Sequence, residues 1–150
     1  MSNPPSTTTG DRTRRRVELL QELLDVPEIA TANLFSIPTY RTGGIAQAGI
    51  EKRGWMEARP AISEAINRCT AVLLAYGGQA PSGPARLHFR DQLAWVQERI
   101  DARDLPVWTV GGRSLHPSRW HRHTYAEHPG VEFREALVRS VQALSTGRAG

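Results

Sequence analysis

Apolar residues recur at helical spacing in four segments of the chain and form short continuous runs in three others. The helical stripes contain Val17, Leu20, Leu23 and Leu24; Ile62, Ala65, Ile66 and Cys69; Phe89, Leu93, Val96 and Ile100; and Phe133, Leu137, Val141 and Leu144. The continuous runs cover residues 29–35, 71–76 and 106–110. A spacing of three or four residues places side chains on one face of a helix, whereas a short continuous run is typical of a strand buried on both faces.

The alternation of these segments predicts the fold class. Helices and strands follow one another in the order helix, strand, helix, strand, helix, strand, helix. Alternating elements favour a parallel sheet with right-handed crossovers and with helices on both of its faces. The sequence therefore predicts an α/β fold of three layers, α/β/α, built on a small parallel sheet of three strands.

The ends of the chain differ in composition from its middle. The first residues are rich in Ser, Thr, Pro and Gly, as in flexible segments and loops. Asp11 or Thr13 is predicted to cap the first helix, and Pro27 to end it. The predicted organisation is a flexible segment or truncated first motif over residues 1–11, a single α/β/α domain over 12–146 and a tail over 147–150.

The composition limits the class of protein. A chain of 150 residues, of which 39% are hydrophobic and 23% charged, fits a globular domain. No apolar run is long enough to cross a membrane, and the first residues lack the charged and apolar regions of a signal peptide. Cys69 is the only cysteine, which excludes an intrachain disulfide and a zinc site built on several cysteines. These features predict a cytoplasmic protein without a membrane partner, and they indicate no cofactor.

The charge of the chain favours a particular class of ligand. Nineteen basic residues oppose fifteen acidic ones, which gives a formal net charge of +4, and eighteen of the nineteen are arginine. Arginines cluster at residues 12–16 and again at Arg113, Arg119 and Arg122. Because arginine makes forked contacts with phosphate, a phosphorylated ligand or nucleic acid is the partner that this pattern favours. A solvated basic surface explains the same residues.

Polar residues and glycines follow each of the three predicted strands. Asn33 ends the first strand, Gly77 and Gly78 follow the second, and His116 and Ser118 follow the third. Parallel strands end at a common edge, where α/β folds hold their ligands. An asparagine side chain can read the edge of a base, and a histidine can donate to a carbonyl oxygen that gains negative charge. The pattern predicts a nucleobase pocket.

The order of these segments resembles that of the uracil-DNA glycosylase superfamily. There, an early loop positions water, an asparagine recognises the base, and a late His-Pro-Ser segment stabilises the departing uracil anion. In this chain, Asn33 in T-A-N-L-F resembles the recognition asparagine, and His116-Pro117-Ser118 resembles the late segment. The segment from Phe133 to Leu137 is similar to the helix that closes those proteins.

The chain also resembles a bacterial and phage family known as domain of unknown function family 1643. The matching segments are Asn3-Pro4-Pro5-Ser6-Thr7, Asp11-Arg12-Thr13-Arg14-Arg15, Asn33-Leu34-Phe35 with Tyr40-Arg41-Thr42, Ala75-Tyr76-Gly77 and His116-Pro117. Two features depart from the pattern. The first motif begins at residue 3, without the strand that precedes it in the family. Asn3 also stands where many glycosylases hold a water-activating carboxylate, so that Asp11 is the nearest acid.

The resemblance implies a nucleobase-binding domain that acts on DNA, with hydrolysis of an N-glycosidic bond as its reaction. The implied catalytic residues are His116, Asp11 and Ser118; the base-binding residues are Asn33, Asn3, Phe35, Tyr40, Gly77 and Gly78; and the phosphate-binding residues are Arg41, Arg113 and Arg119. The expected partner is DNA or a nucleotide.

Other interpretations of the same residues stay open. One is a non-catalytic module that binds nucleic acid or nucleotides, and another is an enzyme that acts on free modified nucleotides. His116, His121, His123 and His128 lie close enough in sequence to hold zinc through three imidazoles. Asn33 and the glycines are also explained by turns of the backbone. A thin sheet without its first strand would expose an edge that a homodimer could cover.

Overall fold

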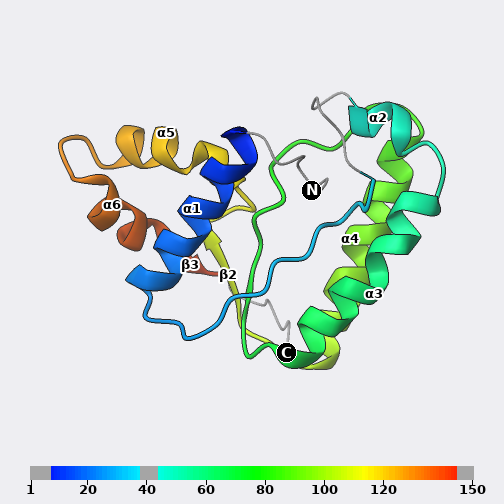
Figure 1. Ribbon diagram of the computed structural model, residues 1–150, viewed down its shortest axis with the longest axis horizontal. Helices are drawn as coiled ribbons and strands as arrows, with labels where there is room; N and C mark the ends of the chain where they lie inside the picture. Colours follow the sequence, from blue (N-terminus) through cyan, green and yellow to red (C-terminus); the bar gives the residue numbers. More distant parts are fainter. Residues whose placement is uncertain (1–7, 38–43, 145–150) are drawn as a thin grey trace, which may run out of the picture. The chain divides into compact units, whose positions relative to one another are not determined.

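The computed structural model describes residues 8–37 and 44–144, and Figure 1 traces them. The chain divides into two compact units. Unit 1 contains Met1–Asp11, Ala30–Cys69 and Gln79–Leu105, and unit 2 contains Arg12–Ile29, Thr70–Gly78 and Pro106–Gly150. Each unit therefore consists of segments that are distant in sequence.

Unit 1 is helical in its described residues. Its helices are α2 (Gly44–Ala48), α3 (Arg53–Arg68) and α4 (Ala85–Ala102). The long helices α3 and α4 lie side by side in Figure 1, and their buried residues include Trp55, Ile62, Val96 and Ile100. This spacing places the apolar stripes of both helices against each other. Phe35 completes the core, because its ring packs 4.8 Å from the Trp55 ring and is fully buried.

Unit 2 contains a three-stranded sheet with the strand order β1-β2-β3. Its elements are α1 (Thr8–Leu23, from Arg12 onward), β1 (Val72–Leu73), β2 (Val107–Val110), α5 (Pro117–Glu127), α6 (Phe133–Ser140) and β3 (Val141–Ala143). β1 pairs in parallel with β2, with Val72 opposite Val107, while β3 pairs antiparallel to β2, with Trp108 opposite Ala143. The sheet is therefore mixed.

The core of unit 2 lies between the sheet and its helices. Leu20 from α1, Val110 from β2, Trp120 from α5 and Leu137 from α6 are almost completely buried and form one cluster with Leu115. Each side chain comes from a different element, so this cluster holds the helices against the strands. Burial of apolar surface on this scale is the main force that stabilises a small domain.

The structure differs from the predicted elements in three places. Residues 29–35 do not form a strand: Ile29 is exposed, and Leu34 and Phe35 are buried through contacts with helices instead of a sheet. The last helix ends at Ser140, and Val141–Ala143 pairs with β2, so the sheet is not wholly parallel. Helix α5 lies in a part of the chain for which no helix or strand was predicted.

Other predictions are confirmed or shifted. β1 and β2 are parallel neighbours, as their apolar runs predicted, and α4 follows the predicted stripe. α1 begins at Thr8, which places Asp11 and Thr13 inside the helix instead of at its cap. The mixture of helices with a small sheet agrees with the α/β class. In the part of the chain that the structure describes, no helix is both long and apolar enough to span a membrane.

Candidate functional site

The loops that follow β1 and β2 meet in unit 2. The Gly77 N–H donates to the Ser114 carbonyl over 2.7 Å, and the Ser114 hydroxyl donates to the Gly77 carbonyl over 3.1 Å. A side chain on Gly77 would begin 3.9 Å from the His116 Cβ. The expected meeting of these two loops at the end of the parallel strands is therefore confirmed.

The chain between β2 and α5 is held firmly. Gly111 and Gly112 both have φ of 76°, a left-handed conformation that glycine adopts without strain, and together they turn the chain out of the sheet. Beyond the turn, Pro117 is buried at the start of α5, and the Trp120 indole N–H donates to the Leu115 carbonyl over 2.9 Å. His116 lies between these anchors and is half-buried.

His116 caps the N-terminus of α5 with its own ring. The Ser118 backbone N–H donates to Nδ1 over 3.1 Å, and the Ser118 hydroxyl lies 2.7 Å from the same nitrogen. An Nδ1 atom that accepts a backbone N–H carries no proton, so in the neutral ring the proton is on Nε2. The cap thus fixes the tautomer and leaves Nε2–H as a donor. Among the described residues, no protein group hydrogen-bonds Nε2.

The surroundings of His116 favour the neutral form of its ring. Burial lowers the pKa of His116, and the positive charges of Arg119 and Arg16 lower it further. The Arg16 guanidinium is fixed beside the site, because Nη1 donates to the Pro117 carbonyl over 2.7 Å. The result is a neutral hydrogen-bond donor in a positive electrostatic field, an environment that suits an electron-rich or anionic oxygen.

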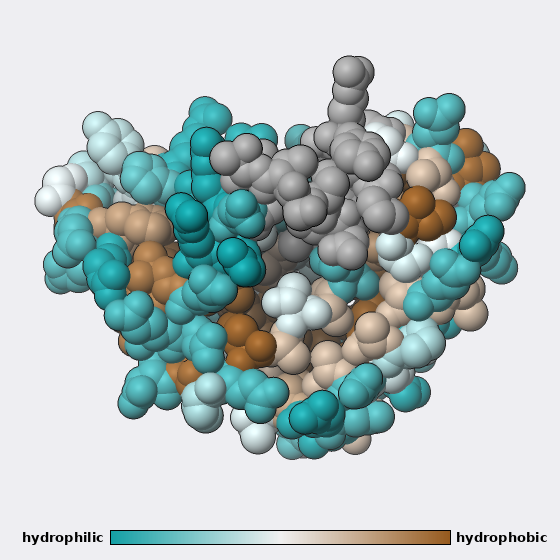
Figure 2. Space-filling view, viewed as in Figure 1, coloured by the Kyte–Doolittle hydropathy of each residue, from teal (hydrophilic) through white to brown (hydrophobic). Residues whose placement is uncertain are grey.

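Arginines extend this positive field over the helices of unit 2. Arg12 and Arg15 are exposed on α1, and Arg119 and Arg122 are exposed on α5. Figure 2 shows a strongly hydrophilic surface over α1. Of the described arginines on α1, Arg14 has a carboxylate partner at ion-pair distance, 3.9 Å from Glu18. Such a surface attracts polyanions over distances of about a Debye length.

The other predicted site residues have different surroundings. Asn33 is half-buried in unit 1, in the extended chain before Leu34, and Asp11 is exposed in the first turn of α1 and belongs to unit 1. Gly78 has no atoms within 4 Å of the position of an added Cβ, and Arg113 is exposed. The predicted residues that lie outside the described part of the chain are Asn3, Tyr40 and Arg41.

Two interpretations are contradicted by the structure. Phe35 is fully buried against Trp55 and Gly54, which contradicts its predicted stacking on a base. The histidines do not assemble a zinc site: His123 packs on Gly111 and His121 on Phe133, while His116 caps α5. In the described residues, no three His, Cys, Asp or Glu side chains come together in a group suited to a metal ion.

Two residues of the site were not predicted from the sequence. Arg16 was noted only as part of a basic cluster, and Ser114 was not noted at all, although it joins the two exit loops. Nothing in the local sequence distinguishes Ser114. For Arg16, the signal was its position four residues before Leu20, on the apolar face of the predicted helix.

Comparisons with known proteins do not extend this description. No protein-family model matches the chain, and neither a curated protein nor a solved structure is significantly similar to it. The resemblance to the uracil-DNA glycosylase superfamily and to domain of unknown function family 1643 therefore stays a prediction from motifs.

Proposed function

We propose that the protein binds a nucleobase in DNA at the edge of unit 2, with His116 as the group that recognises a carbonyl oxygen of the base. The observation that carries this proposal is the hydrogen bond from the Ser118 N–H to Nδ1 of His116, which in the neutral ring leaves the proton on Nε2, while burial and the neighbouring arginines lower the pKa of His116. A neutral donor can hydrogen-bond a base carbonyl, while Arg119 and the exposed arginines of α1 are suited to the neighbouring phosphates.

We further propose hydrolysis of the N-glycosidic bond as the reaction. In that step the oxygen of water bonds to C1′ of the sugar, and the C1′–N bond breaks with its electron pair on the base. The base leaves as an anion whose charge is largely on a carbonyl oxygen, and the water gives up a proton. A preorganised donor to that oxygen is typically worth about a hundred- to a thousand-fold in rate. Asp11 is the candidate that would accept the proton, on the resemblance alone.

A base that reacts must leave the helical stack, which costs a few kcal/mol when DNA is double-stranded. Single-stranded or mismatched substrates therefore require less free energy and are the better first substrates for a test. The expected result is that abasic sites form in oligonucleotides that contain uracil or a modified base. His116→Asn should reduce the rate about a hundredfold or more, because it keeps a capping acceptor but lacks the Nε2–H donor.

The matched control is His88→Asn, which changes a histidine of unit 1 that contacts the Ile50 carbonyl. Asp11→Asn tests the acceptor for the proton of water that the resemblance implies. Absence of abasic sites with every base, or cleavage that His116→Asn leaves unchanged, would overturn the enzymatic proposal.

A second candidate is a non-catalytic module that binds nucleic acid. The observation that favours it is the electrostatics of His116: the side chains that shift its pKa are arginines, and no carboxylate among the described residues raises it. Such a site can bind an anion, but the described part of the chain gives it no neighbouring carboxylate that could accept a proton from water. It predicts binding of oligonucleotides with no abasic product, and a complete lack of binding at low salt would exclude it.

A further inference from the structure

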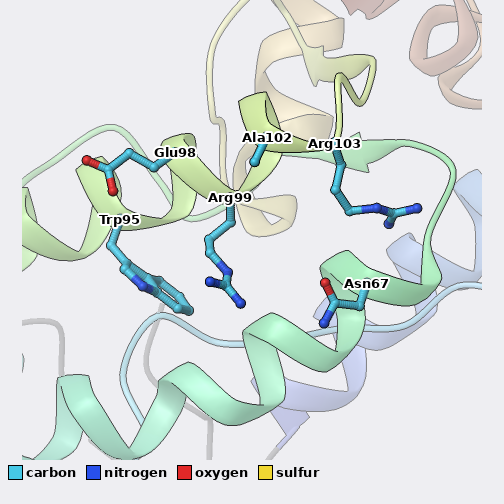
Figure 3. A pocket seen from close by; sticks show the side chains of 6 residues that line it. All are labelled: Asn67, Trp95, Glu98, Arg99, Ala102 and Arg103. Atoms are coloured by element: carbon cyan, nitrogen blue, oxygen red, sulfur yellow. The ribbon is translucent and has the colours of Figure 1, made fainter.

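A groove lies between α3 and α4 in unit 1, and none of the residues discussed above lines it. Its volume is about 240 Å³, and its lining residues are Asn67, Trp95, Glu98, Arg99, Ala102 and Arg103. Asn67 comes from the end of α3, and the others come from the last two turns of α4 and its C-cap. Figure 3 shows these side chains from close by.

Two polar side chains of the groove, Arg99 and Asn67, are directed toward each other. In Figure 3, the guanidinium group of Arg99 and the amide of Asn67 point into the space between the two helices, while the guanidinium group of Arg103 points toward the end of α3 and the carboxylate of Glu98 points away. Two cations and an amide therefore line the groove. The Trp95 ring and Ala102 supply apolar surface beside them.

The arginines in and beside the groove form no ion pair with a carboxylate in the described part of the chain. Arg59 and Arg99 lie 4.7 and 5.3 Å from the centre of the Trp95 ring. Contact with an aromatic face holds a guanidinium in place but leaves its net charge unchanged. None of Arg59, Arg99 and Arg103 forms an ion pair with a described carboxylate. Other arginines of α3 do, such as Arg53, whose Nε lies 2.9 Å from the Glu57 carboxylate.

The arginines are also preorganised. Arg103 donates from Nη1 to the carbonyls of Ile66 and Cys69 at the end of α3, and the Cys69 contact is 3.1 Å. Arg59 donates from Nε to the Gln92 side-chain oxygen over 3.0 Å. Each of these arginines retains further N–H donors. A group that is already held in place loses less conformational entropy when it binds a ligand.

We propose that this groove is a binding site for a phosphate monoester. Arg99 and Arg103 would donate forked hydrogen bonds to the phosphoryl oxygens, and the Asn67 amide would donate a further one. A dianionic group suits two unpaired guanidinium groups better than a single carboxylate does. The groove is also larger than a phosphoryl group requires, and Trp95 and Ala102 would contact the organic part of the ligand.

The test is a titration of the whole protein with glycerol 3-phosphate, with inorganic phosphate and glycerol as comparators. Binding is followed by calorimetry and by the NMR signal of the Trp95 indole N–H, which Trp95→Phe assigns. We expect saturable binding of glycerol 3-phosphate, weaker binding of inorganic phosphate, no binding of glycerol, and a shift of the Trp95 signal. Arg99→Gln should weaken the binding about tenfold or more, because it removes charged hydrogen bonds.

The matched control is Arg90→Gln, which removes the same charge from an exposed position on the same helix outside the groove. An equal loss of affinity in Arg90→Gln and Arg99→Gln would show attraction to net charge alone and would overturn the proposal, as would the absence of saturable binding. Thermal unfolding of each variant verifies that it is folded.

This inference does not rest on the proposed function at His116. The titration is therefore repeated with His116→Asn, whose groove is unchanged. Binding that survives in His116→Asn and is weakened by Arg99→Gln assigns the ligand to the groove between α3 and α4. Binding that is lost with His116→Asn and kept with Arg99→Gln assigns it to the edge of unit 2 and overturns the proposal for the groove, while leaving the proposed function in place.

Discussion

At the scale of single residues, His116 caps α5 through Nδ1 and carries the proposed donor at Nε2, and protonation of Nδ1 would disrupt the cap. Its Nδ1 atom caps α5 as an acceptor, and burial together with Arg119 and Arg16 lowers its pKa below the ordinary value of 6.5. A proton on Nδ1 would turn the acceptor into a donor facing the Ser118 N–H. The neutral ring is thus required both by the helix cap and by the electrostatics of the site.

We predict that the protein loses stability as the pH falls below about 6.5, because the unfolded chain then binds a proton at His116 that the native chain does not. The loss of stability is complete once the pH lies below the pKa of His116 in the native protein, because both states then bind the proton. The measurement is denaturant unfolding at about pH 7.5 and about pH 5.5. His116→Asn keeps an acceptor for the cap but does not titrate, so its stability should depend less on pH. An equal pH dependence in both proteins would contradict this account.

A second prediction at this scale concerns Gly54, which is buried in α3. A Cβ at this position would lie 2.2 Å from Cε2 of the Phe35 ring, and that ring is fully buried. Alanine is favoured over glycine inside a helix by about 1 kcal/mol. We nevertheless expect Gly54→Ala to lower the free energy of unfolding by about 1–3 kcal/mol, as overpacking of a core does.

The control for this prediction is Gly78→Ala, where an added Cβ meets no atom within 4 Å. Its effect should be within about 0.5 kcal/mol, as for other open surface positions. Both variants are compared with the wild type by chemical denaturation. A stabilised Gly54→Ala protein would show that the Phe35 ring yields easily and that the core of unit 1 is loosely packed.

At the scale of elements, Gln92 joins three segments of unit 1. Its side-chain amide donates to the Leu34 carbonyl over 2.9 Å and to the Trp55 carbonyl over 2.8 Å, and its oxygen accepts from Arg59. The residue is fully buried. These bonds replace the strand pairing that the apolar run 29–35 predicted, and they explain how the chain at Leu34 is held without a sheet.

We predict that Gln92→Leu lowers the free energy of unfolding by about 2–4 kcal/mol, because two buried carbonyls lose their donors. The matched control is Gln97→Leu on the same helix, where the side chain is exposed and bonds Asp101 at 2.8 Å. That change should cost less than about 0.5 kcal/mol. Equal effects in the two variants, measured by denaturant unfolding, would mean that Gln92 does not hold the Leu34 segment.

The sequence predicts those helices and strands that are determined by the local pattern of apolar residues. β2 and α4 follow from an apolar run and an apolar stripe. The stripe of Phe133, Leu137 and Val141 continues past the end of α6, because Val141, which is half-buried at the start of β3, packs against the same core as Leu137. The pairing with β2 decides between a helix and a strand at Val141, and that information is not local.

The candidate site could likewise be predicted only in part. The exit loops after β1 and β2 were predicted to meet, since parallel strands end at one edge, and Gly77 and Ser114 do join them. The role of His116 as the cap of α5 was not predicted, because α5 itself was not. Pro117 after a capping residue is a typical start of a helix, so the local signal was present. The position of Arg16, four residues before Leu20, indicates which helix face it shares, but its contact with the Pro117 carbonyl depends on tertiary packing.

At the scale of the whole molecule, the excess of arginine over acidic residues gives a test of the proposed function that does not require the substrate to be known. A protein that contacts phosphates releases counter-ions from DNA, and its affinity falls with salt in proportion to the number of phosphates contacted. We predict that binding of an oligonucleotide weakens steeply between low and moderate salt. Arg119→Gln should reduce the slope of log affinity against log salt by about 1, as for the loss of one phosphate contact.

The control for this measurement is Arg139→Gln on α6, because Arg139 is paired with Glu135 at 2.5 Å, whereas Arg119 forms no ion pair with a described carboxylate. Arg139→Gln changes the net charge of the chain by the same amount as Arg119→Gln. Because Arg139 is already paired with Glu135, its loss should not change the number of counter-ions released when the protein binds DNA. If Arg139→Gln and Arg119→Gln lowered the slope equally, binding would follow net charge, and α5 would not be the surface that contacts the phosphates. A slope that changes only with Arg119→Gln ties nucleic-acid binding to the helix that His116 caps.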